Sequence, residues 1–163
     1  MRNTGLGPSM SGEIEARLQS LGYSLPPASS PLANYVSFLI AGDLLFVSGQ
    51  ISRGADGQVM TGRLGADLGI EAGQVAARAC ALNILAQAQA ALGNLDRIRR
   101  LVRMTGFVSA VSTFMDHPKV LNGASDLMIE VLGDKGRHTR TAVGAASLPA
   151  GSAVEIDAIL QID

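Results

Sequence analysis

The C-terminal stretch GRHTRTAVGAASLPAGSAVEIDAIL has the composition of two buried strands, yet it carries charged residues within or at the start of both apolar runs. Arg140 comes at the start of one apolar run, and Glu155 and Asp157 come inside the next. Alternate residues of a strand share a face, so Glu155 and Asp157 point away from the side taken by Val154 and Ile156. A carboxylate on a strand that is covered on both sides must be paired or must line a cavity.

Two interpretations of these charges stay open from the residues alone. In the first, the two runs form a hairpin, and Arg140 makes an ion pair with a carboxylate across it. In the second, the charges surround a site where the guanidinium of Arg140 binds a small anion. The register between strands decides which residues face each other, because a slip of one residue exchanges the two faces.

Other kinds of site have little support in the sequence. His117 and His138 are far apart and have no ligand-spaced partner, so we expect neither a metal nor a cofactor. The stretch VSGQ lacks the glycine that precedes the serine of a nucleophile elbow, which argues against Ser48 as a nucleophile. Cys80 lies in an alanine-rich helical stretch, where we expect a buried thiol without reactivity.

The composition excludes several classes of partner. The 163 residues suggest a single domain, and 13 basic against 14 acidic residues offer no electrostatic reason to expect nucleic acid or an anionic membrane. No apolar run approaches the ~20 residues of a membrane span. With a single cysteine no intramolecular disulfide can form, so we expect a cytoplasmic protein.

The order of predicted elements indicates an α+β fold. Two main helices are expected on one face of a mostly antiparallel sheet. A leader, a short helix and a proline-rich linker occupy residues 1–33, and the domain proper occupies residues 34–163. The predicted elements are a helix at 11–22, a hairpin at 35–51, a helix at 71–92, a strand at 98–111, a helix at 117–136 and a final hairpin formed by the opening stretch.

The strands of the first predicted hairpin are apolar on both faces. Phe38 and Ile40 alternate with Leu39, while Leu45 alternates with Phe46. Two helices on one side cover only one face of the sheet. A second copy of the same sheet is the simplest cover for the other face, so the pattern predicts a homo-oligomer.

Several motifs together resemble a known family. They are LLFVSGQI at 44–51, ALGNLDRI at 91–98, Asn122 in the second main helix, and RTAVGAASLPAGSAVEIDAI at 140–159. The last is the most specific, with an arginine at the head of a strand, then Leu-Pro, then Val-Glu-Ile-acid-Ala-Ile. From Asn34 to Asp163 the chain resembles the Rid family of reactive intermediate/imine deaminases, also called YjgF-like and often labelled endoribonuclease L-PSP, and in particular a longer subgroup of it.

This resemblance implies a chorismate-mutase-like fold, assembled as a homotrimer with clefts between subunits. Enzymes of the family hydrolyse imines or enamines to 2-keto acids and ammonia. By the resemblance, Arg140 would hold the substrate carboxylate and Glu155 would orient or activate the water. The cleft would be lined by Tyr35, Ser48, Gly49, Asn122 and Ala142. Many members have a cysteine at the position of Ala142, so this chain would work without a catalytic thiol.

Other functions remain as alternatives. A non-catalytic trimer that binds small carboxylates would use the same arginine. The family label suggests a ribonuclease, but the balanced charge and the 4% aromatic content speak against it. Chorismate mutase activity rests on fold analogy alone. The roles of Asp157 and of the N-terminal extension stay open.

Overall fold

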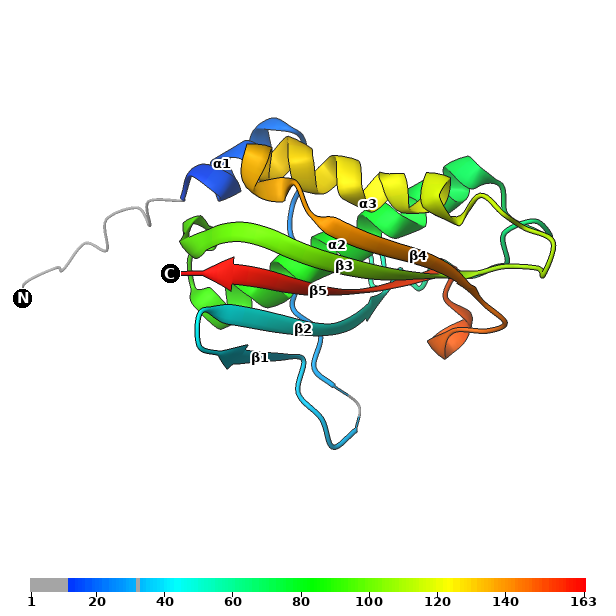
Figure 1. Ribbon diagram of the computed structural model, residues 1–163, viewed down its shortest axis with the longest axis horizontal. Helices are drawn as coiled ribbons and strands as arrows, with labels where there is room; N and C mark the ends of the chain where they lie inside the picture. Colours follow the sequence, from blue (N-terminus) through cyan, green and yellow to red (C-terminus); the bar gives the residue numbers. More distant parts are fainter. Residues whose placement is uncertain (1–11, 32) are drawn as a thin grey trace, which may run out of the picture.

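The computed structural model describes residues 12–31 and 33–163, which fold around a single five-stranded sheet. The strand order is β1-β2-β5-β3-β4, and α2 and α3 lie against one face of it (Figure 1). This arrangement confirms the predicted α+β class. The elements in chain order are α1 (Glu13–Ser20), β1 (Phe38–Ala41), β2 (Leu44–Ile51), α2 (Ile70–Leu92), β3 (Ile98–Ser109), α3 (His117–Leu132), β4 (Thr139–Ala145) and β5 (Val154–Ile162).

The last two strands do not pair with each other, so the predicted final hairpin is wrong. β4 lies at the sheet edge and runs parallel to β3, with α3 as the crossover between them. β5 instead enters the centre of the sheet and pairs antiparallel with both β2 and β3. Every second residue of β5 from Val154 to Ile162 is buried, and a central position covers these apolar residues better than an edge position. The proposed ion pair between Arg140 and Glu155 across a hairpin therefore does not form.

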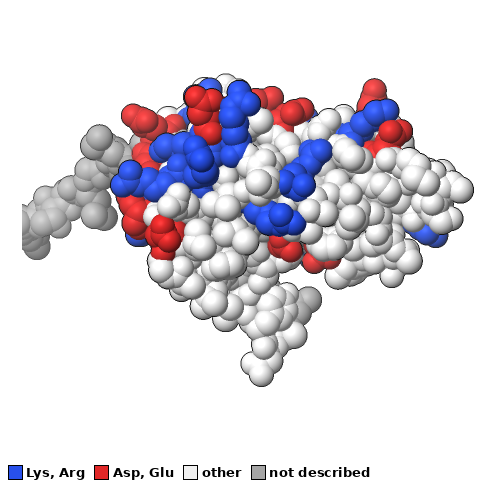
Figure 2. Space-filling model, viewed as in Figure 1, with Lys and Arg blue, Asp and Glu red and all other residues white. Residues whose placement is uncertain are grey.

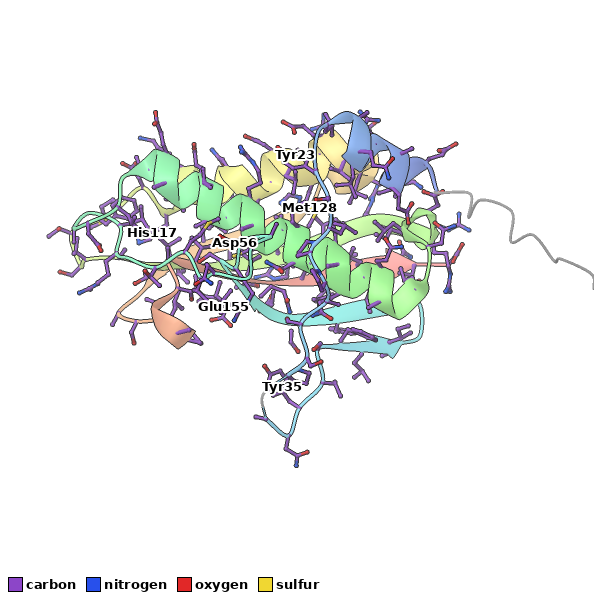
Figure 3. The ribbon with its side chains drawn as sticks, turned by 180° about the vertical axis from the view of Figure 1, so that it is seen from behind. Tyr23, Tyr35, Asp56, His117, Met128 and Glu155 are labelled. Carbon is purple, nitrogen blue, oxygen red and sulfur yellow. The ribbon has the colours of Figure 1, made fainter. Side chains whose placement is uncertain are left out.

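α2 lies beside α3 on the same face of the sheet, with α2 against β2 and β5 and α3 against β3 and β4 (Figures 1 and 3). Its small residues let neighbouring elements approach closely. Cys80 is fully buried in it and donates a weak hydrogen bond to the carbonyl of Val154 at 3.4 Å. The expected burial of Cys80 is confirmed, and burial raises the pKa of this thiol, which disfavours the reactive thiolate.

The expectation that no apolar run is long enough to span a membrane is wrong for α2, whose length and composition alone would allow it. Within this fold 67% of its most apolar window is buried against protein. Core helices pass the same compositional test.

The sheet face opposite the helices is largely apolar, as the alternation in the sequence predicts. The register places Leu39 opposite Phe46 on this face, and Val143 opposite Phe107 on the other side of β5. Leu39 is 58% exposed and Phe46 is 38% exposed. Figure 2 shows this face almost free of charge over β1 and β2, while Lys and Arg side chains gather over β3 and β4.

The N-terminal helix α1 packs onto the end of α3. Its first backbone amides have no acceptor on their own N-cap residue, and the side chain of Asp96 accepts from them instead, at 2.8 Å from Glu13 N and 3.0 Å from Ile14 N. Ile14 and Leu18 are buried in the common core. The division of the chain at residue 33 stays a prediction, but α1 itself is docked on the domain.

Candidate functional site

Arg140 is held against helix α3 by two neutral hydrogen-bond acceptors. In the parallel register of β3 and β4 it lies opposite Met104, which is fully buried on the helix side of the sheet. One nitrogen of its guanidinium, Nη1, donates to Asn122 Oδ1 at 2.9 Å and to Ser125 Oγ at 3.0 Å. Asn122 and Ser125 are three residues apart on α3, which places both on the same side of that helix.

The remaining edge of this guanidinium has no acceptor in the part of the chain that the structure describes. A guanidinium has five N–H groups, and the two on Nη1 are directed at Asn122 and Ser125. None of the ion pairs seen within residues 12–31 and 33–163 includes Arg140. Its Nε and Nη2 groups make no hydrogen bond to these residues. A partly buried cation with a free edge of two parallel donors suits a carboxylate.

A histidine extends the network around Arg140. The hydroxyl of Ser125 lies 3.0 Å from Nε2 of His138, and Nδ1 of the same ring lies 2.6 Å from the carbonyl oxygen of Gly136. The sequence alone argued only against a metal at His138 and gave no role to Ser125. The spacing of three residues from Asn122 on a helix could have indicated Ser125.

Glu155 lies on the opposite face of the sheet from Arg140. It stands between Ile51 on β2 and Phe107 on β3, on the face that the helices leave uncovered. Its carboxylate packs against the backbone of Gly49, where a side chain would overlap the Glu155 Oε1 atom. Partial burial raises the pKa of the Glu155 carboxyl, and the negative charge of Asp157 raises it further.

The other residues expected in the cleft divide between the two faces. Tyr35, Ser48, Gly49 and Asp157 line one shallow hollow on the uncovered face. Tyr35 is 56% exposed on a segment that projects beyond the sheet edge (Figure 3), and Ser48 Oγ donates to the carbonyl of Val36 at 2.7 Å.

Ala142 faces the helices two residues after Arg140, opposite Gly106. Hence one copy of the chain brings Arg140 together with Asn122, and Glu155 together with Gly49. It does not bring Arg140 and Glu155 to the same face.

A family model described as "YjgF/chorismate_mutase-like, putative endoribonuclease" matches residues 15–159. The chain belongs to this family. The match covers β1 to β4, both main helices and residues 154–159 of β5, so the YjgF-like fold expected from the motifs is confirmed.

Relatives within the YjgF family include proteins of nearly the same length. Protein TCP17 of Trypanosoma cruzi is 50% identical over 154 residues, which are 94% of this chain and 96% of that protein. The crystal structure of Atu1372 from Agrobacterium tumefaciens, a protein of unknown function, is 51% identical with a TM-score of 0.87 and covers 93% of both chains. The E. coli protein TdcF, solved with bound serine, is 26% identical with a TM-score of 0.60 and covers 83% of this chain and 94% of its own.

Proposed function

We propose that this protein hydrolyses reactive 2-imino acids, or the enamines in equilibrium with them, to 2-keto acids and ammonia. The observation that carries the proposal is the free Nε and Nη2 edge of Arg140, which has no carboxylate partner among the described residues. A 2-imino acid has a carboxylate on its imine carbon, which this edge could bind. Serine, the molecule bound to the related TdcF, likewise has a carboxylate on the carbon that bears its nitrogen.

In this reaction Glu155 acts on the water. The water oxygen adds to the imine carbon while the Glu155 carboxylate accepts one of its protons, and the C=N bond becomes a C–N single bond as its nitrogen takes that proton from Glu155. The carboxylate then carries the hydroxyl proton of the carbinolamine to the same nitrogen. The C–N bond breaks with its electron pair going to nitrogen, the C=O bond of the keto acid forms, and ammonia leaves. The oxygen of the keto acid therefore comes from water. A raised pKa makes Glu155 a stronger base for this step than an ordinary glutamate.

The two halves of such a site would come from two copies of the chain. Arg140 points toward the helices and binds Asn122 of α3, whereas Glu155 and Gly49 lie on the uncovered side. A homotrimer whose apolar faces meet at its centre would supply both halves at each boundary between subunits. The nearly uncharged surface over β1 and β2 supports this assembly (Figure 2).

The experiment that tests the proposal generates 2-iminopropionate with an amino-acid oxidase and follows its decay with and without the protein. We expect the wild-type protein to accelerate the decay, Arg140→Ala to lose acceleration and binding of pyruvate, and Glu155→Gln to keep binding but lose about 10²-fold or more of the rate. Glu130→Gln, an exposed carboxylate change on α3, is the matched control and should match wild type.

Two outcomes would contradict the proposal. If wild-type protein binds pyruvate but does not accelerate decay, the non-catalytic carboxylate binder is the better description. If Arg140→Ala accelerates decay as well as wild type does, the arginine has no role in the reaction.

A further inference from the structure

We propose that Ser125 and His138 are positioning residues that decide which edge of the Arg140 guanidinium meets the substrate carboxylate. The inference rests on the carboxylate-binding role proposed above for Arg140. Neither side chain is proposed to touch the substrate or the water. Both would act through Arg140.

The direction of each hydrogen bond in this network follows from the chemistry of its ends. The carbonyl oxygen of Gly136 can only accept, so Nδ1 of His138 carries the hydrogen of that bond. In the neutral ring, Nε2 then has a lone pair, and the hydroxyl of Ser125 donates to it. The oxygen of Ser125 is left as the acceptor for Arg140 Nη1.

Two acceptors in fixed places orient a planar cation. Asn122 and Ser125 occupy both hydrogens of Nη1, and these two contacts set the plane and the rotation of the guanidinium. The edge formed by Nε and Nη2 is then turned away from α3. Its two parallel N–H groups match the two oxygens of a carboxylate. If Asn122 were the only acceptor, one hydrogen of Nη1 would have no partner, and the guanidinium could rotate to present a different edge to the carboxylate.

The anchor of the network is a part of the fold that is itself well packed. Gly136 ends the 3-10 turn Gly133–Gly136, is buried, and lies where this turn packs against α3. His138 is two residues before Arg140 and also lies on the helix side. The network thus joins the middle of α3, the turn and the start of β4, and it fixes the position of the guanidinium relative to all three.

Kinetics and binding together separate positioning from a merely structural role. We expect Ser125→Ala to raise KM for 2-iminopropionate and Kd for pyruvate about tenfold, because one hydrogen bond to a charged group is lost. The value of kcat should change less than about threefold, because the water-activating half is untouched. Ser125→Thr keeps the hydroxyl and should restore both constants. His138→Ala should raise the same two constants, and Ser20→Ala, which changes an exposed serine at the end of α1, is the matched serine control.

A second readout does not depend on activity. Nitrogen-15 NMR of the imidazole rings should show His138 as the Nδ1–H tautomer in the wild-type protein, with its Nε2 signal displaced in Ser125→Ala and the signals of His117 unchanged. An Nε2–H tautomer, or a wild-type Kd for pyruvate in Ser125→Ala, would overturn the inference. A protein that binds pyruvate but hydrolyses no imine would contradict only the proposed function, and Kd and the tautomer would still decide the role of Ser125. Failure of the wild-type protein to bind pyruvate would overturn both.

Discussion

At the scale of single residues, the surroundings of Glu155 set the pH range in which it can act as a base. Burial raises the pKa of its carboxyl, and Asp157, two residues along the same strand face, raises it further. The folded protein therefore holds this proton more tightly than the unfolded chain does. The corresponding stabilisation is present at low pH and is lost as the pH rises from the usual glutamate pKa through the raised one. The proposed hydrolysis should show the opposite trend, because the reaction needs the ionised carboxylate.

This environment predicts the effect of Asp157→Asn on the pH profile. Removing the neighbouring negative charge lowers the pKa of Glu155, so the acidic limb of kcat/KM should move to lower pH. Burial, the larger cause, remains, so the limb should stay above the usual glutamate range. The measurement is kcat/KM against pH for wild type, Asp157→Asn and the control Glu130→Gln with the same substrate. A limb that stays in place or moves to higher pH in Asp157→Asn would show that Glu155 is not the titrating base.

At the scale of elements, the contact between α2 and α3 places the acceptors of Arg140. Asn122 and Ser125 flank Gly123, at which the two helices meet without an intervening side chain. A Cβ atom at Gly123 would overlap the backbone oxygen of Gln74 on α2. Because a backbone atom cannot rotate away as a side chain can, α3 would have to move, and the two acceptors would move with it.

The sign of the stability change in Gly123→Ala tests this contact. On an isolated helix, replacing glycine by alanine stabilises by roughly 0.5–1 kcal/mol. Here we expect the free energy of unfolding to fall by about 1–3 kcal/mol, because overpacking against backbone outweighs the gain in helix propensity. Urea denaturation measures the change, and Asp126→Ala on the exposed side of α3 should be neutral or slightly stabilising. A higher free energy of unfolding for Gly123→Ala than for the wild-type protein would contradict this prediction, because it would show that α2 and α3 accommodate the added methyl group without loss of packing.

At the scale of the whole molecule, the separation of Arg140 and Glu155 on two faces makes oligomerisation part of the proposed chemistry. Size-exclusion chromatography with light scattering should give three times the 16.8 kDa mass of the chain. A monomer that still hydrolyses imines would contradict the two-subunit site.

Mixed oligomers test the sharing of residues between subunits. Arg140→Ala and Glu155→Gln subunits, each inactive alone, should regain about one quarter of the wild-type activity after refolding as an equal mixture. In a random trimer that fraction of boundaries has an intact arginine on one side and an intact glutamate on the other. Separate solutions of the two variants, combined without refolding, are the control. No recovery in the refolded mixture would place both residues of a working site in the same chain.

The sequence by itself determined the local structure and the surface pattern. The alternation in VEIDAIL correctly assigned Glu155 and Asp157 to one face and Val154 and Ile156 to the other, because the two-residue period is a property of any strand. The apolar residues on both sides of β1 and β2 correctly predicted an uncovered apolar face. The helical bounds and the family motif were likewise local signals.

Only the tertiary structure decided which strands are neighbours and which side chains meet. β4 and β5 are adjacent in sequence, yet β3 lies between them in the sheet, because strand pairing depends on how all five strands together bury their apolar residues. That placement excluded the ion pair across a hairpin, which was one of the two interpretations open from the sequence, and set Arg140 against Asn122 and Ser125 and, through Ser125, near His138. These residues meet because a helix and a strand edge pack together, and no periodicity along the chain encodes that contact.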